Sequence, residues 1–521
     1  MNWDDEVERG YSTLRSSFAA GKTRPLAWRR EQLEQMKLML REGRNLLEAS
    51  AKVDLNKCST ESYLMEINPV EHEVQTCLDH LDEWSAPESK PVNLLNLPGS
   101  CAVYKDPLGV VLVAGAWNYP IQLCLSPLAG AIAAGNCVMV KVPSVKYATQ
   151  CSSTMAQLIR KYLDNDCIQV IEGDRHAFTA TLKLRFDHIC FTGGLFVGKM
   201  VAEAAAKFLT PTTLELGGKS PLLVDQSADI VVAAKRYTWG ALINCGQTCI
   251  RPDYCMVHFS IADKFIAACK KNIIEMFGDD ASRSDVFGRL INQRAFDRVN
   301  GMVSKDMKYV VHGGSSDPEK AYVEPTLFDF GTDIRAFKNS GCMSEEIFGP
   351  LLPIYRFHDF DECLDFIKQG EKPLVVHIFS TNKSTQERVL TETSSGQACV
   401  NDAILFMSND ALAFGGVGYS GMGSYHGQRT FEMFTHQKSV LKKHFIGDLP
   451  ARYPPYTRGS LWLLKLLQYP YTKLHIYFIK AVLLAMALIV AKQAGVLEGI
   501  VRPLLNNFFS WGASLTSGNW K

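Results

Sequence analysis

Short, predominantly apolar runs alternate with helix-like stretches from residue 101 onward, and this alternation restricts the possible folds more than any other feature. Val110–Ala114 contains only apolar residues, and similar runs occur at Val138–Val142, Pro221–Val224 and Tyr254–His258. A short apolar run bounded by turn residues is typical of a strand buried on both faces. Strands that alternate with helices form open, mostly parallel sheets. The sequence therefore predicts an α/β fold.

The first 90 residues have a different pattern. Between residues 25 and 53, apolar residues recur at spacings of three and four, with charged residues between them. This spacing is typical of an amphipathic helix. The chain of 521 residues is long enough for two or three domains. We therefore expect a helical N-terminal region ahead of the sheet-forming domains.

The stretch NCGQTCIRP, residues 244–252, holds two thiols four residues apart. It allows four interpretations: a metal site, a disulfide, a buried structural thiol or a catalytic nucleophile. Cys245, Cys249 and Cys255 have a spacing that matches no standard zinc pattern, so we expect no metal. The odd total of 15 cysteines and an acidic N-terminus without a secretory signal favour a reducing compartment with free thiols. The disulfide is therefore also disfavoured.

A nucleophilic cysteine needs donors for the oxyanion that forms when it attacks a carbonyl. Cys249 follows Gly-Gln-Thr, where glycine allows a tight turn that leaves backbone amides exposed, whereas Cys245 has no such preceding segment and is expected to pack. The local sequence alone does not separate the two thiols.

Two polar residues next to predicted strands could complete such a site. Asn118, in AGAWNYP, should emerge at the carboxyl end of a buried strand, where an amide can donate to an oxyanion; the alternative is an asparagine that caps the turn. Glu215, in TLELGGKSP, lies in an apolar stretch, where desolvation raises the pKa of a carboxyl group and suits a general base. Its alternative is a solvated carboxylate at the end of a strand or helix.

Glycine and charge add two further constraints. Residues 414–427, FGGVGYSGMGSYHG, form a glycine-rich stretch that is typical of a loop with positive φ values. The formal net charge of +1 gives no reason to expect nucleic acid as a partner.

Near the C-terminus, residues 474–491 are apolar apart from His475 and Lys480. As a helix these 18 residues would be about 27 Å long, just enough to span the core of a bilayer. The alternatives are a buried core helix and an interfacial amphipathic helix. The larger number of basic residues before the segment would keep the main body on the cytosolic side. The basic residues before it are Lys442, Lys443, Arg452, Arg458, Lys465 and Lys473; those after it are Lys492, Arg502 and Lys521.

Several motifs together resemble the aldehyde dehydrogenase superfamily, and within it the class 3, fatty aldehyde dehydrogenase branch. They fall in the family's order and span roughly residues 10–445. The matching motifs are WNYP, FTGG with VGK, LTPTTLELGGKSP, GQTCIRPDY, EEIFGP, VND and FGGVGYSGMGSYHG. The resemblance implies NAD(P)-dependent oxidation of aldehydes to carboxylic acids.

The resemblance also implies a role for each candidate residue. Cys249 matches the nucleophile that attacks the aldehyde to form a thiohemiacetal, which becomes a thioester when hydride leaves. The Asn118 side chain and the Cys249 backbone N–H match the oxyanion donors. Glu215 matches the base that activates water for thioester hydrolysis.

The cofactor residues come from three motifs. Gly193 and Gly198 frame a G-x4-G spacing that resembles the family's strand-to-helix loop, in which the pyrophosphate lies near a helix N-terminus. Thr192 directly precedes this turn. Glu346 resembles the residue that holds the nicotinamide ribose, and Phe348 lies beside it in the motif.

One departure concerns the adenosine ribose. The family usually has Lys-Pro-Ser-Glu, whereas this chain has KVPSV, so Lys141 is retained and Ser144 takes the place of the glutamate. A carboxylate accepts from the 2′-hydroxyl and repels a 2′-phosphate. We therefore expect NAD as cofactor, with a relaxed preference over NADP. The second departure is Gly194-Leu195, where small polar residues are common.

The resemblance predicts two open α/β domains, one for the cofactor and one catalytic, with a small oligomerisation element and a C-terminal hydrophobic helical tail. The expected substrates are medium- to long-chain aliphatic aldehydes, and the expected assembly is a homodimer. The tail would bind membrane lipid at the endoplasmic reticulum, with the catalytic body facing the cytosol. The expected divisions are 1–215 for the N-terminal helices and cofactor domain, 216–395 for the catalytic domain, 396–445 for the return to the cofactor domain with the oligomerisation segment, and 446–521 for the amphipathic and membrane-anchoring tail.

Two alternatives use the same fold. A relative that passes the thioester to coenzyme A would not need the water-activating base at Glu215. A catalytically silent relative would not need Cys249, Glu215 and Asn118 together.

Overall fold

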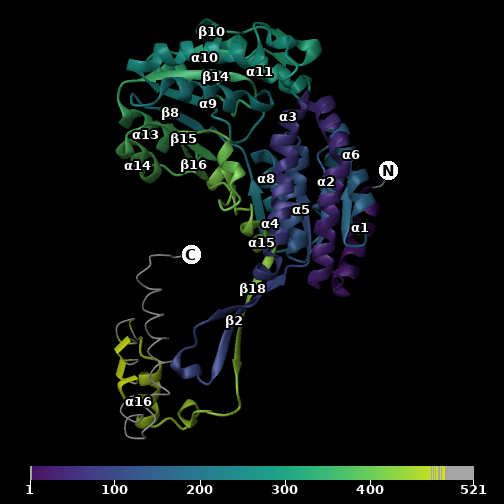
Figure 1. Ribbon diagram of the computed structural model, residues 1–521, viewed down its shortest axis with the longest axis vertical. Helices are drawn as coiled ribbons and strands as arrows, with labels where there is room; N and C mark the ends of the chain where they lie inside the picture. Colours follow the sequence, from purple (N-terminus) through teal and green to yellow (C-terminus); the bar gives the residue numbers. More distant parts are fainter. Residues whose placement is uncertain are drawn as a thin grey trace, which may run out of the picture. The chain divides into compact units, whose positions relative to one another are not determined.

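The computed structural model describes residues 3–470 and positions 472, 475, 477, 478, 481, 482 and 484–486. The chain divides into two compact units (Figure 1). The first contains the described residues up to Pro87 together with Tyr104–Lys438, and the second contains Glu88–Val103 with the described residues from Ser439 onward.

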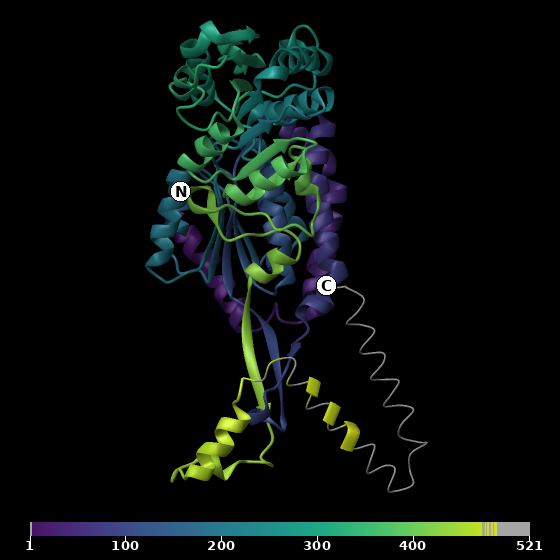
Figure 2. The ribbon, with the colours of Figure 1, turned by 90° about the vertical axis from the view of Figure 1, so that its left-hand side faces the viewer.

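Helices form the N-terminal region, as the periodicity predicted. Helix α2 ends at Leu55 because Asn56 adopts a left-handed conformation, with φ of 55°. Helix α2 packs against α6 and α4, and Figure 2 shows it along one side of the first sheet. The N-terminal helices are α1 (Trp3–Ala19), α2 (Leu26–Leu55), α3 (Ser59–Ser62) and α4 (Asn68–Ser85), with a π-helical turn at Tyr63–Ile67.

The first sheet has six strands in the order β17-β7-β6-β3-β4-β5. All neighbours pair in parallel except β17, which is antiparallel to β7. The strands are β3 (Val110–Ala114), β4 (Cys137–Lys141), β5 (Ile168–Ile171), β6 (His188–Thr192), β7 (Thr212–Glu215) and β17 (Gly421–Met422). The accompanying helices are α5 (Pro120–Ala133), α6 (Thr149–Tyr162), α7 (Arg175–Thr181), α8 (Leu195–Ala206) and α15 (Gln428–Met433).

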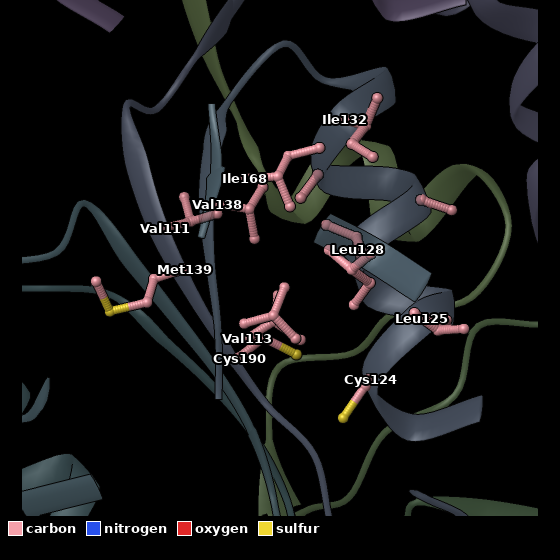
Figure 3. Packing of buried hydrophobic residues seen from close by; sticks show 14 of the residues in the cluster. Val111, Val113, Cys124, Leu125, Leu128, Ile132, Val138, Met139, Ile168 and Cys190 are labelled. Carbon is pink, nitrogen blue, oxygen red and sulfur yellow. The ribbon is translucent and has the colours of Figure 1, made fainter. Parts of the chain in front are cut away.

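The core of this part lies between α5 and the sheet. Figure 3 shows Leu128 and Ile132 of α5 on the same side of the sheet as Val113 and Ile168. All four side chains are buried. The contact between the helix and the sheet therefore explains why β3 and α5 consist mainly of apolar residues.

The second sheet has seven strands in the order β10-β13-β14-β9-β8-β15-β16, parallel except for β10. Strand β16 carries this sheet to Val400, past the boundary expected at residue 395. The strands are β8 (Pro221–Val224), β9 (Tyr254–His258), β10 (Val310–His312), β13 (Thr326–Asp329), β14 (Leu351–Phe357), β15 (Val375–Phe379) and β16 (Gln397–Val400), with a separate hairpin of β11 (Ser316–Asp317) and β12 (Tyr322–Val323). The helices are α9 (Ile230–Leu242), α10 (Ala262–Phe277), α11 (Gln293–Asp306), α12 (Ile334–Lys338), α13 (Phe360–Gln369) and α14 (Lys383–Glu392).

The glycine-rich stretch 414–427 returns to the first sheet. Four of its glycines have positive φ, as expected, and Gly421 pairs with Glu215 in the edge strand β17. A Cβ at Gly421 would lie 2.2 Å from the carbonyl oxygen of Leu214. The edge strand can therefore approach β7 this closely only with glycine at position 421. This contact covers the strand that carries Glu215.

The second unit contains β1 (Glu88–Lys90), which pairs with β2 (Gly99–Pro107), and the helix α16 (Arg458–Leu467). Strand β18 (Thr435–Lys443) also pairs with β2. Most of the apolar segment 474–491 lies outside the described residues. Within the part of the chain that is described, no helix is long and apolar enough to cross a bilayer.

Candidate active site

A cavity of about 660 Å³ brings together the three candidate catalytic residues and part of the candidate cofactor residues. Asn118 follows β3, Glu215 ends β7, Cys249 follows α9, and Glu346 and Phe348 precede β14; all five line this cavity. The parallel strands β6 and β7 end side by side, with Thr192 opposite Glu215. The groups therefore meet at the carboxyl ends of the strands, where open α/β sheets bind their ligands.

The loop before Cys249 has an unusual backbone. Asn244, Cys245 and Gly246 all adopt positive φ, at 53°, 53° and 71°. A Cβ at Gly246 would lie 2.2 Å from the carbonyl oxygen of Gly349, so this position requires glycine. Cys245 is buried in the second core, whereas Cys249 is half-buried and lines two cavities. Only the second thiol of the pair reaches the space available to a ligand.

Hydrogen bonds of Gln247 hold this loop in place. The side-chain nitrogen of Gln247 donates to the carbonyl oxygens of Asn244 (3.1 Å) and Arg289 (2.9 Å), and its oxygen accepts from the N–H of Ile291 at 3.0 Å. Arg251 is 1% exposed and donates to backbone carbonyls, among them that of Leu351 at 2.5 Å. Buried polar side chains that are held by several hydrogen bonds make a loop rigid.

The electrostatic environment of Cys249 keeps the thiol protonated. Burial raises the pKa of Cys249 to about 12, and the carboxyl groups of Glu346 and Glu215 add to this shift. The backbone N–H groups of Cys249 and Ile250 oppose it. These N–H groups are donors that would also stabilise negative charge on a group bonded to the sulfur.

Asn118 is 3% exposed and is fixed at both its backbone and its side chain. Its amide nitrogen donates to the carbonyl oxygen of Gln247 at 3.1 Å. Its own carbonyl oxygen accepts from the Lys57 ammonium (2.8 Å) and from the Asn244 side chain (2.8 Å). A side-chain amide carries two N–H donors, so one remains for an oxygen in the cavity.

Glu215 is 2% exposed, and burial raises its pKa well above the ordinary value. Neither oxygen of its carboxyl group has a hydrogen-bond partner among the described residues. A buried carboxyl group without a partner is costly, so its presence needs an explanation, and a catalytic role is one. The group faces the same cavity as Cys249, which excludes the alternative of a solvated carboxylate at a strand end.

Glu346 and Phe348 form the opposite wall. Burial and the nearby charge of Asp253 raise the pKa of Glu346 to about 8. A Cβ at Gly217 would lie 2.1 Å from a carboxyl oxygen of Glu346, so only glycine leaves room for this side chain. Phe348 adopts a φ of 44° and contacts the ring of Trp117 edge-on, with 5.4 Å between centroids.

A neighbouring cavity of about 610 Å³ contains two further predicted cofactor residues, Lys141 and Ser144. It is lined by Lys141, Ser144, Thr192 and Gly193, and it shares Thr192 and Gly193 with the first cavity. The Lys141 ammonium donates to the carbonyl oxygens of Val142 (2.6 Å) and Gly173 (3.2 Å), and burial lowers its pKa to about 8.

Helix α8 begins where these two cavities join. Its N-cap is Gly194, and the N–H of Gly193 donates to the carbonyl oxygen of Glu215 at 3.0 Å. A Cβ at Gly198 would lie 2.6 Å from Leu216, so glycine lets the helix pack closely against the chain after β7. The two joined cavities, the helix N-terminus and the buried lysine fit an extended dinucleotide.

The sequence matches the aldehyde dehydrogenase family over residues 4–440. The chain belongs to the aldehyde dehydrogenase family. Residues 474–491 lie outside this match. The match confirms the predicted family. Together with the relatives and the solved structure described next, it also confirms the class 3 branch, the α/β fold and the activity of an NAD(P)-dependent aldehyde dehydrogenase.

Among curated proteins, this aldehyde dehydrogenase is 42% identical to a dog protein described as a dimeric, NADP-preferring aldehyde dehydrogenase, over 85% of this chain and 96% of the relative. It is 41% identical to rat aldehyde dehydrogenase family 3 member A2, over 87% of this chain and 93% of the relative. Among solved structures, the substrate-bound AldH of Staphylococcus aureus has a TM-score of 0.85 and 36% identity, over 88% of this chain and 99% of that one.

A third cavity of the aldehyde dehydrogenase, of about 100 Å³, also reaches Cys249. Its walls are mainly apolar and come from several parts of the chain. They include Met65, Leu123, Ile250, Ile404, Phe414 and Tyr425. The carbons nearest the aldehyde group of an aliphatic substrate would be desolvated in such a space.

Two charged residues of the aldehyde dehydrogenase that received no role from the sequence hold the loop of Glu346. Arg298, on α11, donates to the carbonyl oxygens of Glu346 (3.0 Å) and Ile347 (2.6 Å). Asp253 accepts from the N–H of Ile347 at 2.9 Å. Asp253 lies inside the motif GQTCIRPDY and could have been noticed there, whereas no local signal marks Arg298.

Proposed function

We propose that this aldehyde dehydrogenase oxidises medium- to long-chain aliphatic aldehydes, with Cys249 as nucleophile, Asn118 as oxyanion donor and Glu215 as the base for hydrolysis. The single observation that supports these roles is that all three side chains line one cavity. A thiol, an amide donor and an unpartnered carboxyl group are the three groups that acyl transfer through a thioester requires.

In the first half of the reaction, the Cys249 sulfur attacks the aldehyde carbon. Because burial keeps the thiol protonated, its proton passes to solvent water as the bond from sulfur to carbon forms. The oxygen of the adduct becomes negative, and it accepts hydrogen bonds from the free N–H of the Asn118 amide and from the backbone N–H of Cys249. When bound, NAD(P)+ supplies the hydride acceptor that converts this adduct to a thioester.

In the second half, Glu215 removes a proton from a water that attacks the thioester carbon. The bond from carbon to sulfur then breaks, the carboxylic acid leaves, and the proton returns to the sulfur of Cys249. Its raised pKa makes the carboxylate a stronger base than an ordinary glutamate. The same amide donors stabilise the second oxyanion. The presence of this base in the cavity favours hydrolysis over transfer to coenzyme A, and the full set of three groups argues against a silent relative.

The cofactor would be held along the two joined cavities. Lys141 and Ser144 would contact the adenosine ribose, the loop with Gly193 would cover the pyrophosphate, and Glu346 would bind the nicotinamide ribose. The predicted relaxed cofactor preference follows from Ser144, because no carboxylate at this position repels a 2′-phosphate.

We expect Ser144→Glu to raise the ratio of kcat/KM with NAD+ to kcat/KM with NADP+ by about tenfold or more. The introduced carboxylate would repel the 2′-phosphate of NADP+, and like charges brought together cost several kcal/mol. Steady-state kinetics and fluorescence titration of both cofactors would measure the change, with Ser144→Gln as the uncharged control. The prediction is contradicted if the unaltered enzyme already prefers NAD+ by about a thousandfold.

The apolar cavity beside Cys249 supports an aliphatic substrate. The helix α16 exposes Leu461, Trp462 and Leu466, with Arg458 and Lys465 on the same short helix. Together with the sequence of 474–491, this supports binding of the C-terminal part to membrane lipid, at the endoplasmic reticulum with the body facing the cytosol. The dimeric dog relative supports a homodimer.

We expect kcat/KM to rise with chain length from six toward sixteen carbons, because each buried CH2 contributes about 0.8 kcal/mol. For hexadecanal held in anionic vesicles, removal of residues 446–521 should lower kcat/KM by about tenfold or more, while hexanal in solution should be oxidised as before. A flat chain-length profile would contradict the substrate class. An equal loss for both aldehydes would contradict the membrane role.

A further inference from the structure

Two opposite charges are completely buried against the segment that follows β3. The Lys57 ammonium and the Glu66 carboxylate are 2.6 Å apart, and both side chains are 0% exposed. A buried ion pair must overcome the desolvation of both charges and often adds little to stability over an apolar pair. The presence of this pair therefore calls for another explanation, which the remaining contacts of the two side chains provide.

Both charged groups hold the segment that follows strand β3. The Lys57 ammonium donates to the carbonyl oxygen of Asn118 at 2.8 Å and lies 4.0 Å from the ring centroid of Tyr119. The second oxygen of Glu66 accepts from the N–H of Ile121 at 2.9 Å. The ion pair thus joins the start of the segment 118–121 to its end.

Glu66 occupies the π-helical turn Tyr63–Ile67, between α3 and α4. Such turns are rare and frequently occur at functional sites. In this turn Leu64 and Met65 line the apolar cavity beside Cys249, while Glu66 points into the interior toward Lys57. A single local irregularity therefore supplies both a wall of the cavity and the carboxylate of the ion pair.

The carbonyl of Asn118 has little freedom as a result. It accepts from Lys57 on one side and from the Asn244 side chain on the other, both at 2.8 Å. The Asn118 side chain starts from this fixed backbone, and its amide reaches the carbonyl oxygen of Gln247 in the loop that carries Cys249. A change in the peptide plane at Asn118 would move the amide donor away from the reacting carbon.

We propose that Lys57 and Glu66 are positioning residues for the oxyanion donor. They fix the backbone of Asn118 so that its amide meets the oxygen of the adduct on Cys249. This inference rests on the proposed role of Asn118. It concerns only the rate of the step in which the oxyanion forms, because neither side chain lines the cavities that would hold the cofactor.

Four variants test the inference: Lys57→Met, Glu66→Gln, Asn118→Ala and the double variant Lys57→Met with Asn118→Ala. The measurement is single-turnover NADH formation with enzyme in excess over aldehyde, in which the rate constant does not depend on the amount of inactive protein. Fluorescence titration of NAD+ gives cofactor affinity separately. Arg29→Met is the matched control, because Arg29 is another buried cation, on α2, whose hydrogen bonds go to Thr23, Arg24 and Ala133.

We expect Lys57→Met and Glu66→Gln each to lower the rate constant by about tenfold or more, with the Kd of NAD+ changed by less than about twofold. Arg29→Met should lower the melting temperature but leave the rate constant unchanged. In the Asn118→Ala background, Lys57→Met should cause no further loss, since the group that it positions is already absent.

If the losses from Lys57→Met and Asn118→Ala multiply, the pair does not act through Asn118 and the inference is overturned. Unchanged rate constants in Lys57→Met and Glu66→Gln overturn it too. If Asn118→Ala itself keeps the full rate, the proposed function fails, which is a separate result. If Lys57→Met does not fold, the same comparison of single and double variants can be made with Glu66→Gln, which keeps the shape of the side chain. Its double variant is Glu66→Gln with Asn118→Ala.

Discussion

Replacement of Cys249 by alanine is expected to lower kcat/KM for aldehyde oxidation by roughly ten-thousandfold or more, since loss of a nucleophile removes the covalent route entirely. Cys249 is half-buried and lines the cavities in which the aldehyde and the cofactor would meet. No other cysteine lines these cavities among the described residues. Steady-state NADH formation measures the loss, and fluorescence titration of NAD+ should remain unchanged.

The chain provides a matched control for this prediction four residues away. Cys245 has the same chemistry but is 1% exposed and packs in the second core. Cys245→Ala should therefore lower stability slightly while leaving kcat/KM within about threefold, because it removes only a small buried side chain. Retention of aldehyde oxidation in Cys249→Ala, or its loss in Cys245→Ala alone, would reverse the assignment of the two thiols.

Glu215→Gln is expected to stop the reaction at the thioester. The variant should release one NADH for each active site in a burst, after which steady-state turnover should fall by about a hundred- to ten-thousandfold. Glutamine preserves the volume, and no hydrogen bond to a described residue is lost, because the carboxyl oxygens have none. Stopped-flow absorbance of NADH distinguishes the burst from the later rate.

The pH dependence gives this prediction a second readout. Because burial raises the pKa of Glu215 well above the ordinary range of a carboxyl group, its basic form accumulates at higher pH than that of an exposed glutamate, and steady-state turnover should rise with it. Glu215→Gln should lose this rise. Glu345→Gln is the control, since Glu345 lines the same cavity but is exposed. Full turnover in Glu215→Gln, or a stalled reaction in Glu345→Gln, would contradict the role of Glu215 as base.

The strands and the main site groups could be predicted because their signals are local. The apolar run Val110–Ala114 became β3 without change of bounds, and Pro221–Val224 and Tyr254–His258 became β8 and β9 in the same way. Short motifs such as GQTC and LELGG, through their resemblance to the family, selected Cys249 and Glu215 as candidates, and both line the same cavity. The proximity of Cys249, Glu215 and Asn118 itself could not be read from local sequence, because parallel sheets join segments far apart in the chain.

The supporting groups were missed for a physical reason. Lys57 and Glu66 lie nine residues apart, and charged residues at such positions usually face solvent on amphipathic helices. A π-helical turn at Tyr63–Ile67 places Glu66 inside, and helical periodicity does not reveal such a turn. The left-handed backbone of Cys245 could not be predicted for the same reason. A cysteine does not favour positive φ, and the course of the loop follows from its packing against Gly288 and Gly349.

The most direct test of the central claim is to locate the acyl group on the enzyme. Glu215→Gln would be mixed with a fatty aldehyde and NAD+, quenched in acid and digested with trypsin, and the peptide that contains both Cys245 and Cys249 would be fragmented in a mass spectrometer. We predict one acyl group per chain, on the sulfur of Cys249. An acyl group on Cys245, or NADH formation without any acylated cysteine, would contradict the account.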